Sequence, residues 1–253
     1  MTLTTRPYAF ELNGALSSRA TLGLIALSTD ATIEQEWRNL INVPGVEFHT
    51  GRVLSDATVN PDTLAEMEQR LETSARALLT GQTLDVIAYA CTSASLVIGE
   101  TQVERALQQV FPGASVTTPL TAVKQAVKCL GSKRIAMLTP YIDTINQQMA
   151  NHLSTGETKV VVMGSFLNDQ DPEVVRISGD SIESAAIDLA FRESPDLLFI
   201  ACTALRGAHL VDRLETSLGI PVTTSNHAMA WHALRLAHVD DQYSGCGILF
   251  SNH

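Results

Sequence analysis

The sequence predicts an α/β fold with two pseudo-symmetric, Rossmann-like domains, each with a parallel sheet, and a functional site in the cleft between them. Short apolar runs of strand length alternate with amphipathic stretches of helix length, which is typical of parallel sheets with helical crossovers. The pattern occurs twice along the 253 residues. Cys91 and Cys202 are 111 positions apart, and so are Ser28 and Thr139, each of which closes the first strand of its half. This constant offset indicates an internal duplication.

The first half is expected to hold four strand–helix units. Ser28, Thr29 and Asp30 follow the first apolar run and can cap the helix after it. Gly131 is expected to end the last helix of this half. The expected strands span residues 21–27, 46–53, 85–90 and 116–119, and the expected helices span 31–37, 61–79, 95–110 and 120–130. Residues 1–19 show no clear period, and we expect them to pack on the surface or onto a partner subunit.

The second half repeats this order. The expected strands span residues 135–138, 159–163, 196–201 and 222–226, and the expected helices span 142–153, 181–193, 207–218 and 228–237. A polar loop is expected at 164–176 and a final strand at 245–250. We expect residues 1–125 to form the first domain, completed by the C-terminal segment 226–253, and residues 126–225 to form the second.

Composition and charge exclude several classes of protein. Hydrophobic residues make up 45% of the chain, enough for a sizeable packed core. The formal net charge of −10 argues against nucleic-acid binding, which needs clustered Lys and Arg. No apolar run approaches the roughly 18 residues of a membrane span, and no basic, then apolar leader is present. We therefore expect a cytoplasmic protein that binds neither nucleic acid nor membrane.

The cysteines point to chemistry rather than to disulfides or metal. In the cytoplasm the four cysteines should be reduced. No Cys/His spacing suits zinc, and neither a dinucleotide-binding fingerprint nor a Walker loop occurs. The sequence therefore predicts no metal and no cofactor. Cys129 lies late in an expected helix and Cys246 between glycines, and both are expected to be small packing residues.

Cys91 and Cys202 have matching surroundings. Each ends an apolar strand, is preceded six positions earlier by an aspartate and is followed by a threonine. The carboxyl ends of parallel strands are where such sheets bind ligands. A helix N-terminus after each cysteine would lower its pKa, so one thiol could act as base or nucleophile and the other as proton donor. Two thiols on opposite faces of one carbon can transfer a proton, or add to a double bond and protonate it, without a metal or a cofactor.

Polar residues near these strand ends are candidates for binding a small carboxylic acid. Hydroxyl and amide groups could hold carboxylates and an enediolate-like anion. Those close to the cysteines are Thr92, Ser93, Thr203, Ser225 and Asn226. A phenol at a strand end could add a donor, as could an amide in the polar loop. The phenol is that of Tyr141, which could instead be a buried ring without a function. The amide is that of Asn168, which could instead form an Asx turn.

Several motifs resemble the aspartate/glutamate racemase superfamily, and within it the branch of maleate cis-trans isomerases and arylmalonate decarboxylases. The motifs cover most of the chain. They are Ala90-Cys91-Thr92-Ser93, Leu138-Thr139-Pro140-Tyr141, Glu173-Val174-Val175-Arg176-Ile177, Ala201-Cys202-Thr203-Ala204-Leu205-Arg206 and Thr224-Ser225-Asn226-His227-Ala228. The resemblance implies two α/β domains, no cofactor and, from family habit, a homodimer or a higher homo-oligomer.

The resemblance also implies roles for single residues. In maleate isomerases the cysteine matching Cys91 attacks the double bond, and the cysteine matching Cys202 donates the proton. Residues matching Tyr141 and Asn168 help to bind the carboxylates. Arylmalonate decarboxylases keep only the second cysteine, so the presence of Cys91 disfavours decarboxylation.

Asp30 departs from the maleate isomerase pattern, which has an asparagine there. An ionised Asp30 would repel a substrate carboxylate but would accept an ammonium or hydroxyl group. A Ser-Thr-Asp run also resembles the ectoine-utilisation proteins that are similar to maleate isomerases. The overall resemblance favours a maleate isomerase-like enzyme as the leading hypothesis, whereas Asp30 favours an amino-acid-like or hydroxylated substrate. The alternatives are a racemase or epimerase of an amino acid or ectoine derivative, an arylmalonate-type decarboxylase, and a non-catalytic protein that senses a small acid.

Overall fold

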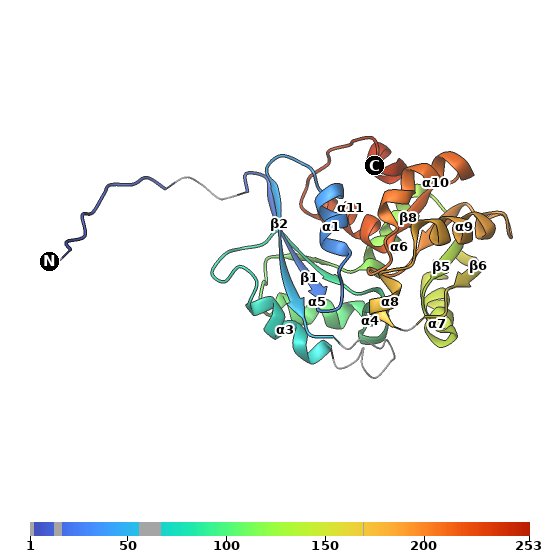
Figure 1. Cartoon of the computed structure of the whole chain (residues 1–253), viewed down its shortest axis with the longest axis horizontal. Coiled ribbons are helices and arrows are strands. Elements are labelled where there is room, and N and C mark those ends of the chain that lie inside the picture. The colour runs from blue at the N-terminus through green and yellow to red at the C-terminus, as the bar shows by residue number, and fades with distance from the viewer. Residues whose placement is uncertain (1–2, 13–16, 56–66, 169) are drawn as a thin grey trace.

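The computed structural model describes residues 3–12, 17–55, 67–168 and 170–253 and has two four-stranded parallel sheets with helices packed around them (Figure 1). The two sheets have equivalent strand orders, β2-β1-β3-β4 and β6-β5-β7-β8. Both the predicted α/β class and the duplication of the strand pattern are therefore confirmed.

The first sheet brings the ends of its central strands to one edge. Its strands are β1 (Ala20–Leu27), β2 (Val46–Val53), β3 (Val86–Ala90) and β4 (Ser115–Thr117). All three pairings are parallel. Every residue of β3 is buried, as its uninterrupted apolar sequence predicts. Because Ala26 pairs with Ala90, the segments that begin at Ser28 and Cys91 leave the sheet side by side.

The second sheet repeats this arrangement. Its strands are β5 (Arg134–Thr139), β6 (Lys159–Ser165), β7 (Leu197–Ile200) and β8 (Val222–Thr224). Ile200 is level with Leu138 on one side and with Thr224 on the other. The segments that carry Cys202 and Ser225 therefore also leave their sheet at one edge.

Helices follow the strands in both halves. The first half contains α1 (Ile33–Leu40), α3 (Glu68–Arg76), α4 (Thr92–Ile98), α5 (Glu100–Gln108) and α6 (Pro119–Leu130). The second contains α7 (Asp143–Leu153), α8 (Asp171–Val174), α9 (Gly179–Ala190), the 3-10 helix η1 (Ala208–Leu210), α10 (Val211–Leu218), α11 (Ser225–Leu236) and α12 (Gly247–Asn252). None of the helices in the described ranges is long and apolar enough to cross a membrane.

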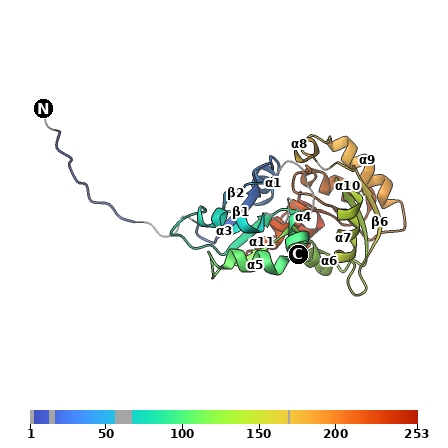
Figure 2. The same ribbon diagram turned by 90° about the horizontal axis from the view of Figure 1, so that it is seen from below.

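Helix α11 ties the two halves together. It follows β8 of the second sheet, yet it packs on α1, β3, β4 and α6 of the first half. All its residues from Ser225 to Leu234 are buried. Figure 2 shows it among the elements of the first half. The division of the chain into domains at residues 125/126 and 225/226 stays a prediction.

One expected helix is interrupted. The helix expected at 95–110 is two helices, α4 and α5, and the first begins earlier, at Thr92. Gly99 separates them with φ of 92° and ψ of 135°, a conformation in which the helical hydrogen-bond pattern cannot continue. The earlier start matters for function because it makes Cys91 the N-cap of α4.

The prediction of a final strand at 245–250 is wrong, because residues 247–252 form helix α12. A short apolar run does not distinguish a strand from a buried helix turn. The helix is favoured here because the Glu215 carboxylate accepts a hydrogen bond from the Ile248 backbone N–H at 2.7 Å, in the first turn. Phe250 then packs against His227 and Tyr243, with ring centroids 4.9 and 5.3 Å apart.

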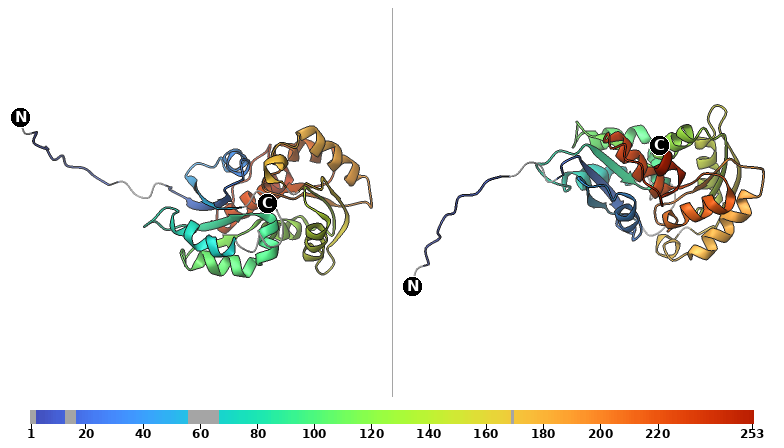
Figure 3. Two further views of the ribbon diagram at one scale, coloured as in Figure 1. Left: turned by 60° about the horizontal axis from the view of Figure 1, so that its bottom comes forward. Right: turned by 90° about the horizontal axis from the view of Figure 1, so that it is seen from above.

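Two other expectations concern the first half. Of the helix expected at 61–79, the structure describes α3, and residues 61–66 lie outside the described residues. Residues 3–12 form an extended arm that leaves the body of the protein in every view (Figures 1 and 3). Tyr8 and Phe10 are 77% and 80% exposed. The expectation that this arm packs on the surface of its own chain is therefore wrong. Its packing on a partner subunit stays a prediction.

We expect Gly131→Ala to lower the free energy of unfolding by ~1 kcal/mol, because Gly131 ends α6 in the left-handed conformation, with φ of 68°. An added Cβ would meet nothing within 4 Å there, so the effect isolates the backbone conformation. Gly113→Ala is the matched control, since its surroundings are equally open and its φ is not left-handed. Urea denaturation of both variants measures the difference, and equal midpoints would contradict this interpretation.

Candidate functional site

Cys91 lies where β3 ends and α4 begins. It has an extended backbone conformation and caps the helix, since its Sγ accepts a hydrogen bond from the Ala94 N–H at 3.4 Å. The Ser93 hydroxyl lies 3.7 Å from the same sulfur. The thiol is therefore held by the N-terminus of α4, as the sequence predicts for this cysteine.

Cys202 follows β7 in a different way. Its φ is 105°, which L-residues other than glycine rarely adopt. No regular helix starts beside it, because the first helical turn after β7 is η1, which begins at Ala208. The expectation of a helix N-terminus directly at Cys202 is therefore wrong. Strain of this kind, with a cost on the order of 1–3 kcal/mol, tends to persist at functional sites.

One serine hydroxyl joins the two cysteine loops. Ser225 Oγ accepts a hydrogen bond from the Cys202 backbone N–H at 3.0 Å and lies 2.8 Å from Thr92 Oγ1. Because it already accepts from Cys202, it is free to donate its proton to Thr92. The Thr203 hydroxyl adds a second link across the halves by donating to the Ala90 carbonyl at 3.4 Å. Cys91 and Cys202 therefore leave their strands toward a shared region.

Tyr141 belongs to the same group of side chains. It is 3% exposed. Burial raises its pKa well above the ordinary value, and negative charge on Cys202 or Cys91 and a hydrogen bond with the Cys202 thiol raise it further. The phenol is thus neutral and able to donate a hydrogen bond at neutral pH. Tyr141 therefore lies beside the cysteines, and its contact with a substrate carboxylate stays a prediction.

The expected acidic thiols are not found. Burial raises the pKa of Cys91 to about 12; the Ala94 N–H lowers it, and the nearby carboxylates of Asp171 and Asp30 raise it. Burial also raises the pKa of Cys202, followed by the charge of Asp171. The two side chains are only 4% and 5% exposed, so desolvation outweighs the helix dipole. Both thiols are protonated at neutral pH.

Asp171 is a site residue that the sequence analysis missed. It is the first residue of α8, inside the segment predicted to be a polar loop, and is 5% exposed. Thr29 Oγ1 donates to its Oδ2 at 2.8 Å. Burial raises the pKa of Asp171 to about 6, although this hydrogen bond lowers it. Pro172 directly after it is a helix-start signal that could have indicated an ordered acid here.

Asp30 turns one carboxylate oxygen inward. Its Oδ1 accepts from the N–H groups of Thr32 and Ile33 at 2.7 and 3.0 Å and so caps α1. Its Oδ2 is buried and accepts no hydrogen bond within the described part of the chain. Burial raises the pKa of Asp30, while those two N–H groups, the nearby Thr203 hydroxyl and the charge of Arg52 lower it. The charge of Asp30 acts on both Cys91 and Asp171.

Asn226 supports the Cys202 loop. Its Nδ2 donates to the Thr203 carbonyl at 2.8 Å and to Glu36 Oε2 at 2.7 Å. Glu36 also accepts from the Ala208 N–H at 2.9 Å. Burial raises the pKa of Glu36 to about 7, in spite of these donors. Glu36 was not anticipated from the sequence, because it reads as an ordinary acid in the first turn of a helix.

Asn168 is engaged in its own loop. Its Oδ1 accepts from the Gln170 N–H at 2.9 Å, which is the Asx turn named as its alternative, and its Nδ2 donates to Glu173 at 2.9 Å. Its contact with a substrate carboxylate stays a prediction. Among the residues that the structure describes, no group of three or more His, Cys, Asp or Glu side chains could hold a metal ion.

Comparison with protein families and curated proteins gives consistent matches. The family model described as arylmalonate decarboxylase matches residues 22–250. A maleate isomerase of Nocardia farcinica is 28% identical over 238 residues, which is 90% of this chain and 94% of the relative. A maleate isomerase of Pseudomonas putida is 24% identical over 91% of this chain and 96% of the relative. An arylmalonate decarboxylase of Bordetella bronchiseptica is 31% identical, but over only 49% of this chain and 52% of the relative.

Solved structures match over nearly the whole chain. A variant of the Nocardia farcinica maleate cis-trans isomerase, in which a serine replaces a cysteine and a succinylcysteine intermediate is covalently bound, superposes with a TM-score of 0.85 at 26% identity. It covers 92% of this chain and 99% of that one. A variant of arylmalonate decarboxylase has a TM-score of 0.81 at 24% identity, over 92% of this chain and all of the other, and shares the fold.

We expect native-state labelling with an aromatic disulfide reagent at pH 8 to modify Cys129 first, because it is the exposed cysteine. Cys91 and Cys202 should react much more slowly, because both are buried and their raised pKa leaves little thiolate. Peptide mass spectrometry over time gives the order, and Cys129→Ser should remove the fast phase. A fast phase from Cys91 or Cys202 would show that these thiols are acidic after all.

Proposed function

The chain belongs to the arylmalonate decarboxylase family of the aspartate/glutamate racemase superfamily, and we propose that it is a cofactor-independent isomerase of a small carboxylic acid, of the maleate cis-trans isomerase type. The observation that carries the proposal is the pair of buried thiols at equivalent strand ends, on two loops that are joined through Ser225. The nearly full-length likeness to proteins named maleate isomerase supports the choice of substrate.

The chemistry follows from what two thiols can do to a carbon–carbon double bond. The sulfur of Cys91 adds to one alkene carbon, and the neighbouring carbon takes the proton of Cys202. Rotation about the resulting single bond is then free. The Cys202 thiolate removes the proton again, the double bond re-forms and the bond from carbon to the Cys91 sulfur breaks. The intermediate is a succinyl thioether, the species held by the solved Nocardia farcinica relative.

Addition requires that Cys91 first lose its proton. Asp171 is our candidate acceptor, because its charge acts on both cysteines and its pKa of about 6 leaves it ionised at neutral pH. The N-terminus of α4 stabilises the thiolate as it forms. The hydroxyl of Thr92, which can accept the proton of Ser225, and the phenol of Tyr141 supply donors for the substrate carboxylates and for the anion that addition creates.

A second candidate is favoured by the buried acids. Asp30 and Asp171 place two carboxyl groups near the thiols, and Asp30 Oδ2 accepts no hydrogen bond in the part of the chain described. A substrate with an ammonium group would satisfy that oxygen and neutralise its charge. Racemisation or epimerisation of such a substrate would use the same two thiols, one to remove the α-proton and the other to return it. Decarboxylation is disfavoured because it needs a proton donor on one face only.

We expect the protein to convert maleate to fumarate, and Cys91→Ser or Cys202→Ser to lower kcat about a hundredfold or more, since each removes an obligatory proton or bond transfer. Proton NMR of the reaction mixture follows both acids. The Cys202→Ser variant, incubated with maleate, should also gain the mass of one maleate on the peptide that contains Cys91.

Cys129→Ser and Cys246→Ser are the controls, and their rates should stay within about twofold of the parent because surface substitutions rarely matter. Full activity of either site variant would refute a two-thiol mechanism. If no fumarate forms and solvent deuterium instead enters the α-carbon of an amino acid, the second candidate is correct.

We expect Asp30→Asn to raise kcat/KM for maleate about tenfold, because it removes a like charge that costs about 1–4 kcal/mol at 4 Å from a carboxylate. The asparagine oxygen can still cap α1, and the amide nitrogen replaces the unpaired oxygen. Asp212→Asn, an exposed acid in the first turn of α10, is the matched control. An unchanged or lower kcat/KM for maleate would contradict this charge argument.

A further inference from the structure

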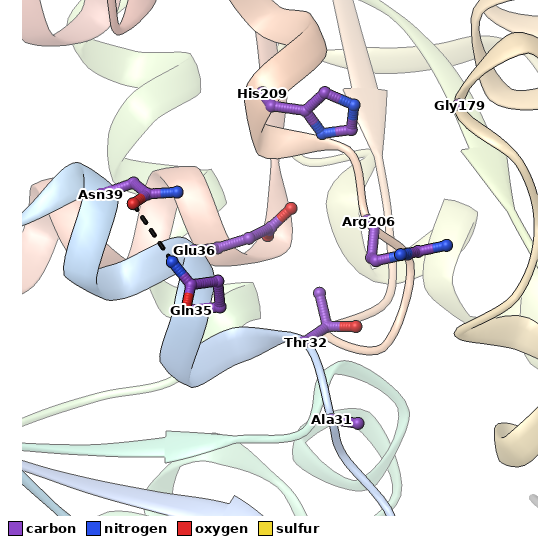
Figure 4. A pocket seen from close by; sticks show the side chains of 8 residues that line it. All are labelled: Ala31, Thr32, Gln35, Glu36, Asn39, Gly179, Arg206 and His209. Atoms are coloured by element: carbon purple, nitrogen blue, oxygen red, sulfur yellow. Dashed lines mark hydrogen bonds between the residues drawn. The ribbon is translucent and has the colours of Figure 1, made fainter.

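A pocket lies between α1 of the first half and the segments around Arg206 and Gly179 of the second, and neither Cys91 nor Cys202 lines it (Figure 4). Its volume is about 460 Å³, within the range of small-molecule sites. One wall of the pocket is lined by Thr32, which precedes α1, and by Glu36 within α1. The other wall is lined by Arg206 and His209. The pocket therefore bridges the two halves of the molecule.

The pocket is separate from the thiols. Asp30 and Thr32 belong to one loop, and Cys202 and Arg206 belong to another. The two loops touch where Thr32 Oγ1 donates to the Ala204 carbonyl at 2.8 Å. Asp30 and Cys202 lie before this contact in their loops, whereas Thr32 and Arg206 line the pocket. Each loop thus supplies both sites.

The wall from the second half is cationic. Arg206 and His209 are exposed, and neither has a hydrogen bond or ion pair within the ranges that the structure describes. Helix α9 begins at Gly179 in the same wall, and a Cβ there would lie 3.5 Å from His209 Nε2. Burial and the charges of Arg213 and Arg206 lower the pKa of His209. An unpaired arginine beside a neutral imidazole donor suits a carboxylate ligand.

The opposite wall is acidic. Glu36 is 8% exposed and lines the pocket, and its two carboxylate oxygens accept hydrogen bonds from the Ala208 N–H and from Asn226 Nδ2. No ion pair joins Glu36 to Arg206 within the described ranges, so the two charges are more than 4 Å apart. A ligand with two negative groups would be repelled by Glu36, whereas an ammonium would stabilise its ionised form.

We propose that this pocket binds a small zwitterion of the amino-acid class, with its carboxylate on Arg206 and His209 and its ammonium toward Glu36. Glu36 is linked through Asn226 to the carbonyl of Thr203, the residue after Cys202. A ligand in the pocket would therefore brace the loop that carries Cys202. The proposal does not depend on the reaction that the thiols perform.

Isothermal titration calorimetry on the full chain tests this with glycine, L-alanine, L-glutamate and L-lysine as probes. At least one should bind, and its N-acetyl derivative and succinate should not. Arg206→Gln should weaken binding about tenfold or more, the loss expected for one charge-assisted hydrogen bond. Arg192→Gln is the matched control, because Arg192 is exposed, pairs with Asp188 and does not line the pocket. It should leave the affinity unchanged.

Binding at the thiols is distinguished by Asp171→Asn, which should not alter the affinity. The proposal is overturned if no probe binds, if Arg206→Gln binds as well as the parent, or if Asp171→Asn and not Arg206→Gln abolishes binding. Equal binding of succinate would also overturn it, because the pocket would then be a simple anion site. None of these results bears on turnover of maleate, which is measured separately.

Discussion

The hydroxyl of Ser225 is the contact on which the geometry of the thiols depends. It accepts the N–H of Cys202 and bonds Thr92 beside Cys91, so it fixes the two cysteine loops relative to each other. Ser225 is also the first residue of α11, which comes from the second sheet and packs against the first. Because α11 is buried along ten consecutive residues, this contact cannot shift without disturbing the core of both halves.

Burial governs the chemistry of the site more strongly than the helix dipole does. A dipole at a helix terminus is worth at most about 2 kcal/mol, whereas burial of an ionisable group can shift its pKa by several units. Cys91 has the dipole and is still neutral, and Asp171 and Glu36 have raised pKa values as well. The resting site thus holds protons on its thiols, with carboxylates beside them that can accept one.

The sequence was sufficient for everything that depends on periodicity and duplication. Both sheets and the positions of Cys91 and Cys202 follow from apolar runs that recur at a fixed spacing, but the strand expected at 222–226 ends at Thr224 and α11 begins at Ser225. What it could not give depends on packing between distant segments. Asp171 becomes a site residue only because α8 folds over Thr29, 142 positions away. The helix at 247–252 depends likewise on Glu215, and the pKa of each thiol depends on burial that no local pattern encodes.

The two halves are similar, yet their cysteines are not equivalent, and this difference argues for their order in the reaction. Cys91 has an extended backbone and accepts an N–H from the first turn of α4, so a negative charge on its sulfur would be stabilised. Cys202 has a strained backbone and no helix directly after it, and burial and the charge of Asp171 raise its pKa although hydrogen bonds from Tyr141 and Ala204 lower it. A sulfur that must attack needs the first environment, and one that must keep a proton until a carbanion forms needs the second. We therefore infer that Cys91 forms the bond to carbon and Cys202 delivers the proton, because reversing the roles would place the developing charge where the protein stabilises it less.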